Sequence, residues 1–464
     1  MIGREKYSEA AIAQRLTYLL LAILILFGAV ALALAYWSVV RTEVLAERPD
    51  NPRGLEAEYR VQRGSILDRN NVVLAENGGP ANQQERLYPL TESGPAVGYY
   101  SLRYGASGIE ESYDTILRGA DISSAESTLN ELLHIPPSGR NVRMTLDATL
   151  QQAATQLMRD QQGALVLIEL GGADEQPTAD IRAMVSQPWY DPAELDALFE
   201  ALAAGEDISF FNRATQGSYQ PGLILFPLLT ASAVTDGIID PLDTVAEVNR
   251  LVEVDGLTER CLNPPEGETA DWFDAVRGLC PGAAADLGEL MGADNLADAF
   301  RALGLTTAPE IPIPTAETDE VVITDAAEAG LGQGTLTISP LQAALAYGAL
   351  AGSGTLPQPR LVDAVQQPAG QWGIVDPTQS TTGAVFSGET AYRVRQVLPQ
   401  EDTISGFSVP VVSAPNGQVN EWYVGVTPSV SPRYVAVVVL EQPEEVGTAE
   451  TIGRGILTQA SLQP

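Results

Sequence analysis

The hydrophobic pattern of the chain begins with one long apolar run near the N-terminus. No charged residue occurs from Leu16 to Val40, and aromatic residues stand near both ends of the run. About 20 apolar residues span the hydrocarbon core of a bilayer, so the run predicts a transmembrane helix over residues 16–40. A cleaved signal peptide is the alternative, because small residues alternate with leucine over residues 31–35. Signal peptides have a shorter apolar region of about 7–15 residues, which favours the uncleaved anchor.

The charges that precede this run predict its orientation. Arg4, Lys6 and Arg15 come before it, and basic residues concentrate on the cytoplasmic side of membrane proteins. Residues 1–15 are therefore expected in the cytoplasm, and everything after Arg41 outside it. No second apolar run approaches this length, which predicts a single crossing of the cell (plasma) membrane.

Beyond residue 60 the pattern alternates between strand-like and helix-like segments. Residues 63–75 predict a β-hairpin around an Asp-Arg-Asn-Asn turn, and Asp147 can cap a helix with apolar residues on one face. Strands at both ends of the later sequence, with helices between them, predict an α+β fold in which helices pack on one antiparallel sheet. The other buried strands are expected at 164–170, 183–186, 422–426 and 434–440, and a last helix within 447–460.

Two segments without clear periodicity mark the domain organisation. Residues 41 to about 60 are charged and have the character of a stalk. Residues 136–139 read Pro-Pro-Ser-Gly, a stiff link that breaks helices. We therefore predict a small β-rich domain over residues 41–138 and a larger domain over 139–464. His134 lies beside the link, and its expected role is structural.

The charge balance excludes one class of partner. The chain has 26 Lys and Arg residues against 60 Asp and Glu residues, a net charge of −34. A nucleic-acid-binding surface needs basic side chains that neutralise phosphates, so nucleic acid is not an expected partner.

Three scarce residue types limit the available chemistry. The chain contains one histidine, two cysteines and one lysine, Lys6. A zinc site or a Ser-His-Asp arrangement is not expected from this set, since the single histidine stands apart from any ligand or nucleophile pattern. No metal and no cofactor are therefore predicted. No local pattern singles out two carboxylates that could act on a sugar.

The two cysteines, Cys261 and Cys280, predict a disulfide. Both lie on the expected exterior side, where thiols tend to be oxidised, and the chain has no other cysteine to compete. Two buried free thiols are the alternative.

A series of short motifs resembles the class B penicillin-binding proteins, in the order in which that family carries them. Those before the link resemble the non-catalytic pedestal of the family, and those after it resemble the transpeptidase domain. The motifs are Arg63-Gly64-x-Ile66-x-Asp68-Arg69-Asn70, Gly105-Ala106-Ser107-Gly108-Ile109-Glu110, Thr145-Leu146-Asp147, Pro188-x-Tyr190-Asp191-Pro192, Tyr219-Gln220-Pro221-Gly222, Gly332-Gln333-Gly334 and Trp422-Tyr423-Val424-Gly425.

This resemblance implies a fold and a place of work. The fold is the transpeptidase fold shared with serine β-lactamases, an antiparallel five-stranded sheet with helices on both faces. The work is on peptidoglycan, outside the membrane. The resemblance also implies partners of the polytopic glycan polymerase type among membrane wall-synthesis or division proteins.

The family's catalytic elements are replaced in this sequence. In such enzymes a serine attacks, and a lysine one helical turn later takes its proton, within S-x-x-K. The corresponding positions hold Leu223 and Phe226, and the S-x-N positions hold Leu279 and Pro281. Residues 409–415, before the Trp-Tyr-Val-Gly motif, contain no K-T-G. No realignment restores these elements, because the only lysine is on the expected cytoplasmic side and arginine stays protonated.

The sequence therefore predicts a catalytically inactive transpeptidase-fold protein, a scaffold or regulator in cell-wall synthesis or division. One alternative is an active D,D-transpeptidase that uses an unrecognised serine such as Ser218 or Ser413. A second alternative is a module that binds stem peptides without reacting. A pocket lined by Leu223, Phe226 and Leu279 would suit a peptide carboxylate poorly.

Overall fold

The structure, a computed structural model, has two separate units. It describes residues 9–37, 61–80, 84–120, 138–173, 176–204, 210–254, 256–316, 321–377, 383–413 and 418–463. The first unit contains helix α1 (Glu9–Ala35), of which Gln14–Ala35 is long and apolar enough to cross a membrane. The predicted stalk, His134 and the two link prolines lie outside the described residues.

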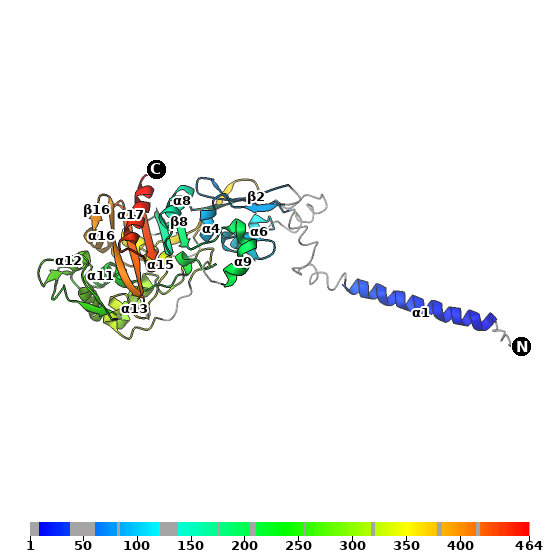
Figure 1. Ribbon diagram of the computed structural model, residues 1–464, viewed down its shortest axis with the longest axis horizontal. Coiled ribbons are helices and arrows are strands. Elements are labelled where there is room, and N and C mark those ends of the chain that lie inside the picture. The colour runs from blue at the N-terminus through cyan, green and yellow to red at the C-terminus, as the bar shows by residue number, and fades with distance from the viewer. Residues whose placement is uncertain are drawn as a thin grey trace. The chain divides into compact units, whose positions relative to one another are not determined.

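The second unit is organised around a seven-stranded sheet (Figure 1). Its order is β13-β8-β7-β19-β18-β17-β16. Every neighbouring pair is antiparallel except β13 with β8. The five long strands are those that the fold class predicts, and β13 and β16 add short edges. The bounds are β7 Gly163–Ala173, β8 Gln176–Gln187, β13 Gln358–Arg360, β16 Gln400–Glu401, β17 Ile404–Ser413, β18 Gln418–Thr427 and β19 Tyr434–Leu440.

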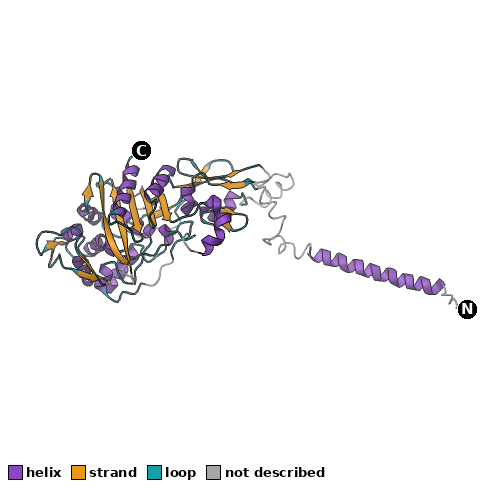
Figure 2. Ribbon diagram, in the orientation of Figure 1, coloured by secondary structure: helices purple, strands orange, loops and turns teal. Residues whose placement is uncertain are grey.

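Helices cover both faces of this sheet, as Figure 2 shows. On one face, α8 and α17 bury Leu150, Met158 and Ile456 against Tyr423 and Val438. The other face carries the larger core, to which α11, α13 and α15 contribute. Each strand therefore has apolar side chains on both sides, which is why residues 434–440 are apolar without alternation.

The helices begin where the sequence supplies caps. Asp147 accepts hydrogen bonds from the backbone N–H groups of Thr149 and Leu150 at the start of α8. Ser339 and Gln342 form a capping box at the start of α15. The helices of this part are α8 Ala148–Leu157, α9 Leu195–Ala204, α10 Arg213–Gln216, α11 Leu225–Thr235, α12 Trp272–Gly278, α13 Pro281–Ala302, α14 Ala326–Gly330, α15 Pro340–Ala351, α16 Gly388–Val397 and α17 Thr448–Ser461, with 3-10 turns η3 Pro192–Glu194 and η4 Gly222–Ile224.

A second, smaller sheet has the order β15-β14-β6-β1-β2-β3. The predicted hairpin is confirmed, since β1 pairs with β2 around the Asp-Arg-Asn-Asn turn. The sheet also takes in strands from far along the chain: β6 pairs with both β1 and β14, and β14 pairs with β15. The strands are β1 Ile66–Leu67, β2 Val73–Gly78, β3 Glu85–Leu87, β6 Val142–Met144, β14 Val362–Gln366 and β15 Trp372–Ile374.

Residues 62–120, here called the pedestal, contain β1, β2 and β3 of this sheet and several short elements. The domain boundary at residues 138 and 139 stays a prediction. The short elements are η2 Thr91–Ser93, α4 Gly94–Val97, β4 Tyr100–Ser101, β5 Gly105–Ala106, α5 Gly108–Ser112 and α6 Asp114–Leu117.

Two further strand pairs follow α11 in the large domain. One is a small hairpin of β10 Val252–Val254 with β11 Leu257–Glu259, and the other joins β9 Thr244–Val245 to β12 Ala270–Asp271.

Buried ion pairs hold the pedestal together. Arg63 contacts Glu110 at 2.7 Å and Asp114 at 2.5 Å, and Arg86 contacts the other oxygen of Glu110 at 2.6 Å. The side chains of Arg63, Arg86 and Glu110 are almost completely buried. We call Arg63, Arg86, Glu110 and Asp114 the pedestal cluster. Gly64 belongs to the same packing, because a Cβ there would come within 2.0 Å of the carbonyl oxygen of Arg140.

A second set of polar contacts joins the pedestal to the large sheet. The carboxylate of Asp68 accepts hydrogen bonds from its own turn and from the N–H of Ala148, at the start of α8. Arg69 contacts Glu169 at 3.1 Å, and Arg182 contacts the same carboxylate. We call Asp68, Arg69, Glu169 and Arg182 the polar joint.

Candidate functional site

The segment that the sequence motifs align with S-x-x-K is folded into the core. We call Gly222–Pro227 the slot; it consists of η4 and the first turn of α11. The side chain of Leu223 is 7% exposed and that of Phe226 is 0% exposed. Gly222 has φ of +58°, a backbone conformation that favours glycine and turns the chain into the helix.

Strand β17, in which K-T-G is expected, packs directly on the slot. A Cβ at Gly222 would come within 2.4 Å of a methyl group of Val411. Val409 and Val411 are buried in the same apolar cluster as Leu223 and Phe226. The space between the strand and the start of the helix is therefore filled by hydrocarbon side chains at this point.

The other predicted motifs of the large domain converge on the slot through the backbone. The N–H of Gly222 donates to the carbonyl oxygen of Gly332 at 2.9 Å. A Cβ at Gly332 would come within 2.2 Å of the carbonyl oxygen of Gly222, so glycine is required for the close approach. The indole N–H of Trp422 donates to the carbonyl oxygen of Gln220 at 3.0 Å. These contacts fix the chain directly before Leu223.

Gly425 lies on β18, the strand that also contains Trp422. Its Cα lies against Tyr423, because a Cβ there would come within 2.2 Å of the Tyr423 hydroxyl oxygen. Gln333 is 3% exposed, and Gly334 follows it with φ of +88°. The motif residues thus act through packing and backbone geometry.

The segment that resembles the S-x-N region forms the turn between α12 and α13. Leu279 and Cys280 are completely buried and belong to the same apolar cluster as the slot, and Pro281 opens α13. Cys280 forms a disulfide with Cys261, with a Cα–Cα distance of 4.1 Å. The predicted pairing is therefore present, and it ties the turn to the segment after β11.

Two serines, Ser218 and Ser413, are the alternative nucleophiles that the sequence suggests. Ser218 lies before the slot, and its Oγ is 2.5 Å from Oγ1 of Thr337 in an exposed contact. Ser413 is the last residue of β17, and its backbone pairs with that of Gln418 on β18. Leu223, Phe226 and Leu279 can neither accept a proton nor form an acyl bond, so acyl transfer at this place would need a group from elsewhere.

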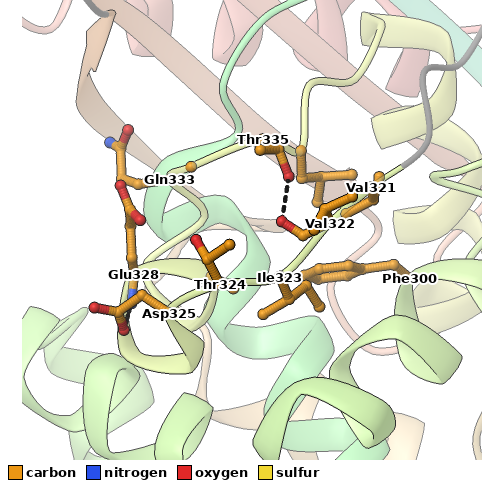
Figure 3. Close-up of a pocket in the computed structure, with 12 residues that line it drawn as sticks. Phe300, Val321, Val322, Ile323, Thr324, Asp325, Glu328, Gln333 and Thr335 are labelled. Atoms are coloured by element: carbon orange, nitrogen blue, oxygen red, sulfur yellow. Dashed lines mark hydrogen bonds between the residues drawn. The ribbon is translucent and has the colours of Figure 1, made fainter.

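A small pocket lies beside the Gly332-Gln333-Gly334 turn. Figure 3 shows Glu328 and Gln333 on one side of it, and Phe300 and Ile323 on the other. The hydroxyl of Thr335 donates to the carbonyl oxygen of Val322 at 3.1 Å. The slot residues do not line this pocket, and it holds no nucleophile paired with a base.

Two titratable groups, Tyr219 before the slot and Glu259 on β11, have strongly raised pKa values. Burial raises the pKa of Tyr219 well above its ordinary range, and the carboxylate of Glu441, to which its hydroxyl donates at 2.7 Å, raises it further. Burial raises the pKa of Glu259 to about 7. Among the described residues, no three His, Cys, Asp or Glu side chains are placed to hold a metal ion.

The sequence motifs did not indicate every residue of this region. The contact of Val411 with Gly222 and the hydrogen bond from the Tyr347 hydroxyl to the carbonyl oxygen of Ile224, at 2.6 Å, were missed. A glycine directly after a proline at the start of an apolar helix was the available signal for the first. No local signal indicated the second, since it joins residues more than a hundred positions apart.

Comparison with known protein families gives two matches. Residues 174–458 match the penicillin binding protein transpeptidase domain, and residues 63–142 match the penicillin binding protein A dimerisation domain. Among characterised relatives, the peptidoglycan D,D-transpeptidase PbpA of Mycolicibacterium smegmatis is 28% identical, over 87% of this chain and 88% of its own length.

Solved structures agree with these matches. The D,D-transpeptidase domain of a peptidoglycan glycosyltransferase from Eggerthella lenta is 26% identical, with a TM-score of 0.73, covering 86% of this chain and 98% of that one. The penicillin G acyl-enzyme complex of penicillin-binding protein A from M. tuberculosis is 25% identical, with a TM-score of 0.74, covering 87% of this chain and 100% of that one.

Proposed function

Because this chain belongs to the class B penicillin-binding proteins, we propose that it is a membrane-anchored, catalytically inactive member that acts as a scaffold or regulator in peptidoglycan synthesis or division. The observation that carries the proposal is the single lysine, Lys6, which precedes the candidate membrane span. Both S-x-x-K and K-T-G chemistry need a lysine beside the nucleophile. None is available after residue 6.

The packing of the slot supports the same proposal. Leu223 and Phe226 stand where the family carries its serine and lysine, and both are buried in one apolar cluster with Val411 and Leu279. A peptide carboxylate or a β-lactam carboxylate needs a polar, cationic site to replace its hydration. This requirement also argues against a module that binds stem peptides at the slot.

Reaction with penicillin tests the proposal directly. Intact-mass measurement after incubation with benzylpenicillin should show no adduct on this chain. Penicillin-binding protein A of M. tuberculosis, which forms a penicillin G acyl-enzyme, is the positive control. An adduct on any serine would favour the alternative, an active transpeptidase, and Ser218→Ala and Ser413→Ala would then identify the nucleophile.

Partial repair should not restore the reaction. Leu223→Ser with Phe226→Lys supplies only one of three elements, and residues that act as a unit are not additive. Near-ultraviolet circular dichroism should first establish that this double variant is folded. Strong labelling of the folded variant would mean that other residues perform the roles of the S-x-N and K-T-G elements.

The proposal includes a location. We place residues 1–15 in the cytoplasm, a single span in the plasma membrane, and the bulk of the chain outside, because Arg4, Lys6 and Arg15 precede the span. Protease added to intact protoplasts should digest the bulk of the chain. Full protection would contradict this orientation.

The proposal also includes partners. A scaffold of this family is expected to bind membrane wall-synthesis or division proteins of the polytopic glycan polymerase type. Affinity purification from detergent-solubilised membranes, with and without prior covalent crosslinking, should recover such proteins together with the full chain. A variant with an unrelated transmembrane helix in place of residues 16–40 separates partners of the span from partners of the exterior part.

A further inference from the structure

Two adjoining hollows lie where the pedestal meets the large sheet. One is lined by α8 and the two residues Arg159 and Asp160 after it, by Glu92 of η2 and by Gln187 of β8. The other extends along η2, α4 and the end of β8. Both are lined by Glu92, Thr155 and Gln187, so they form one continuous depression, which we call the junction groove. It contains none of the slot residues.

Buried amides fix the two walls of the junction groove relative to each other. Gln151 is completely buried, and its amide N–H₂ donates to the carbonyl oxygens of Glu92 and Met184, both at 2.8 Å. Asn212 is 5% exposed and donates to the carbonyl oxygen of Pro95 at 2.8 Å. The groove is therefore formed before any ligand arrives, which lowers the entropy cost of binding.

The groove presents amides beside an aromatic pair. Gln152 and Gln156, one turn apart on α8, are exposed, and Gln187 is half-buried. Each amide can donate and accept hydrogen bonds, as hydroxyl and acetamido groups require. The half-buried ring of Trp189 lines the groove and stacks on the buried ring of Tyr190, with the centroids 4.7 Å apart. The exposed part of the Trp189 ring beside convergent amides suits a pyranose ring, whose faces are apolar and whose rim is polar.

The charges of the groove exclude anionic ligands. Its lining contains one basic residue, Arg159, against Glu92, Asp160 and Asp191. A phosphate-bearing polymer or a nucleotide would meet net repulsion. An apolar peptide helix would leave the glutamine amides without partners, which costs free energy. A neutral, polyhydroxylated chain meets neither obstacle.

We propose that the junction groove binds a neutral, N-acetylated polysaccharide chain. That this chain is the glycan strand of peptidoglycan rests on the proposed function. The groove then holds the protein against the product of the polymerases beside it, and no acyl chemistry at the slot is needed.

The test uses the full chain in detergent micelles and chitohexaose as the probe, because this neutral oligosaccharide has the N-acetylglucosamine backbone without peptide. Titration calorimetry should show saturable binding. Gln152→Ala with Gln156→Ala should weaken it at least about fivefold, since several hydrogen bonds to the acetamido and hydroxyl groups are lost. Gln459→Ala, which changes an exposed glutamine on α17, should leave the affinity unchanged. Cellohexaose, which lacks acetamido groups, should bind more weakly than chitohexaose.

Three results would overturn the proposal. These are the absence of saturable chitohexaose binding, unchanged affinity in the double variant, and binding only of muropeptides through their stem peptides. Sedimentation with purified peptidoglycan, with the double variant compared to Gln459→Ala, provides the second readout. A penicillin adduct would overturn the inactive site and leave these binding results unaffected, so the two proposals fail separately.

Discussion

The pedestal cluster and the slot both lie largely in the interior, but they are built from opposite kinds of side chain. In the pedestal cluster and the polar joint, arginine and carboxylate groups satisfy one another inside the protein. At the slot, the interior is filled with hydrocarbon from Leu223, Phe226 and, on β17, Val411. A buried ion pair is held by its geometry and is costly to break on one side, whereas an apolar contact tolerates changes of shape. The two regions should therefore fail in different ways.

The largest effect is expected from breaking the pedestal cluster on one side. Glu110→Ala leaves Arg63 and Arg86 buried without their shared carboxylate, and should lower the free energy of unfolding by about 3–5 kcal/mol. Urea unfolding of the full chain in detergent micelles measures it. Glu450→Ala removes an exposed partner of Arg454 and should cost less than about 0.5 kcal/mol. Equal losses in the two variants would contradict the comparison.

The converse change introduces a charge into the slot. Phe226→Lys removes a fully buried ring and places an amine among apolar side chains, which should cost about 3–4 kcal/mol. Phe226→Met keeps the site apolar and close in volume, and should cost less than about 1.5 kcal/mol. The same urea titration compares the two. If Phe226→Lys were as stable as Phe226→Met, the slot would contain a polar or hydrated space.

The disulfide should stabilise the turn between α12 and α13, which belongs to the same apolar cluster as the slot. Cys261→Ser with Cys280→Ser opens a loop with a sequence separation of 19 residues, which should lower stability by about 3 kcal/mol on the chain-entropy account. Reduced wild-type protein should show a similar loss. A much smaller loss in both would mean that the packing around Leu279 holds this turn without the bridge.

The smallest effect is a dependence of stability on pH, which differs between Glu169 of the polar joint and Glu259 of β11. Glu169 is partly buried, which opposes its ionisation, but Arg182 and Arg433 outweigh this and lower its pKa. Its ionised form therefore stabilises the fold at neutral pH, and this stabilisation is lost as the pH falls below about 4.5 towards the lowered value. Burial raises the pKa of Glu259 to about 7, so stability should fall as the pH rises from about 4.5 to 7.

Two variants test these opposite slopes. Glu259→Gln should be more stable than the wild type above pH 7, by roughly 1–3 kcal/mol, and should lose this advantage below about pH 5. Glu169→Gln should be less stable at pH 7, and the difference should shrink in acid. Urea midpoints at several pH values between 3 and 8 give both slopes. Parallel slopes in the two variants would mean that the carboxylates have similar surroundings.

The sequence anticipated the fold where a local pattern carries the information. Residues 434–440 form β19 with the expected bounds, and Asp147 caps α8 as its position indicated. The disulfide followed from counting two cysteines. The pairing of β14 with β6 was not anticipated, because the pairing of strands more than two hundred residues apart leaves no local pattern.

Less of the site could be anticipated. The sequence indicates which side-chain types stand after Pro221-Gly222, and their assignment to the catalytic positions of the family stays a prediction. How the slot is filled depends on Val411, which arrives from a strand almost two hundred residues later. The junction groove was missed for a similar reason, since its walls come from two separate stretches of chain and neither has a motif of its own.

The smaller sheet has a consequence for the order in which the molecule is made. Strands β1 to β3 leave the ribosome early, but β14 and β15 are synthesised only when residues 362–374 have been added. Until then, the edge that they will cover has free backbone donors and acceptors, which can pair with another chain. The smaller sheet thus cannot be completed during synthesis of the first third of the protein. A fragment ending at residue 138 would also lack β6, so it would expose the edge of β1 that β6 covers and should self-associate when it is expressed alone.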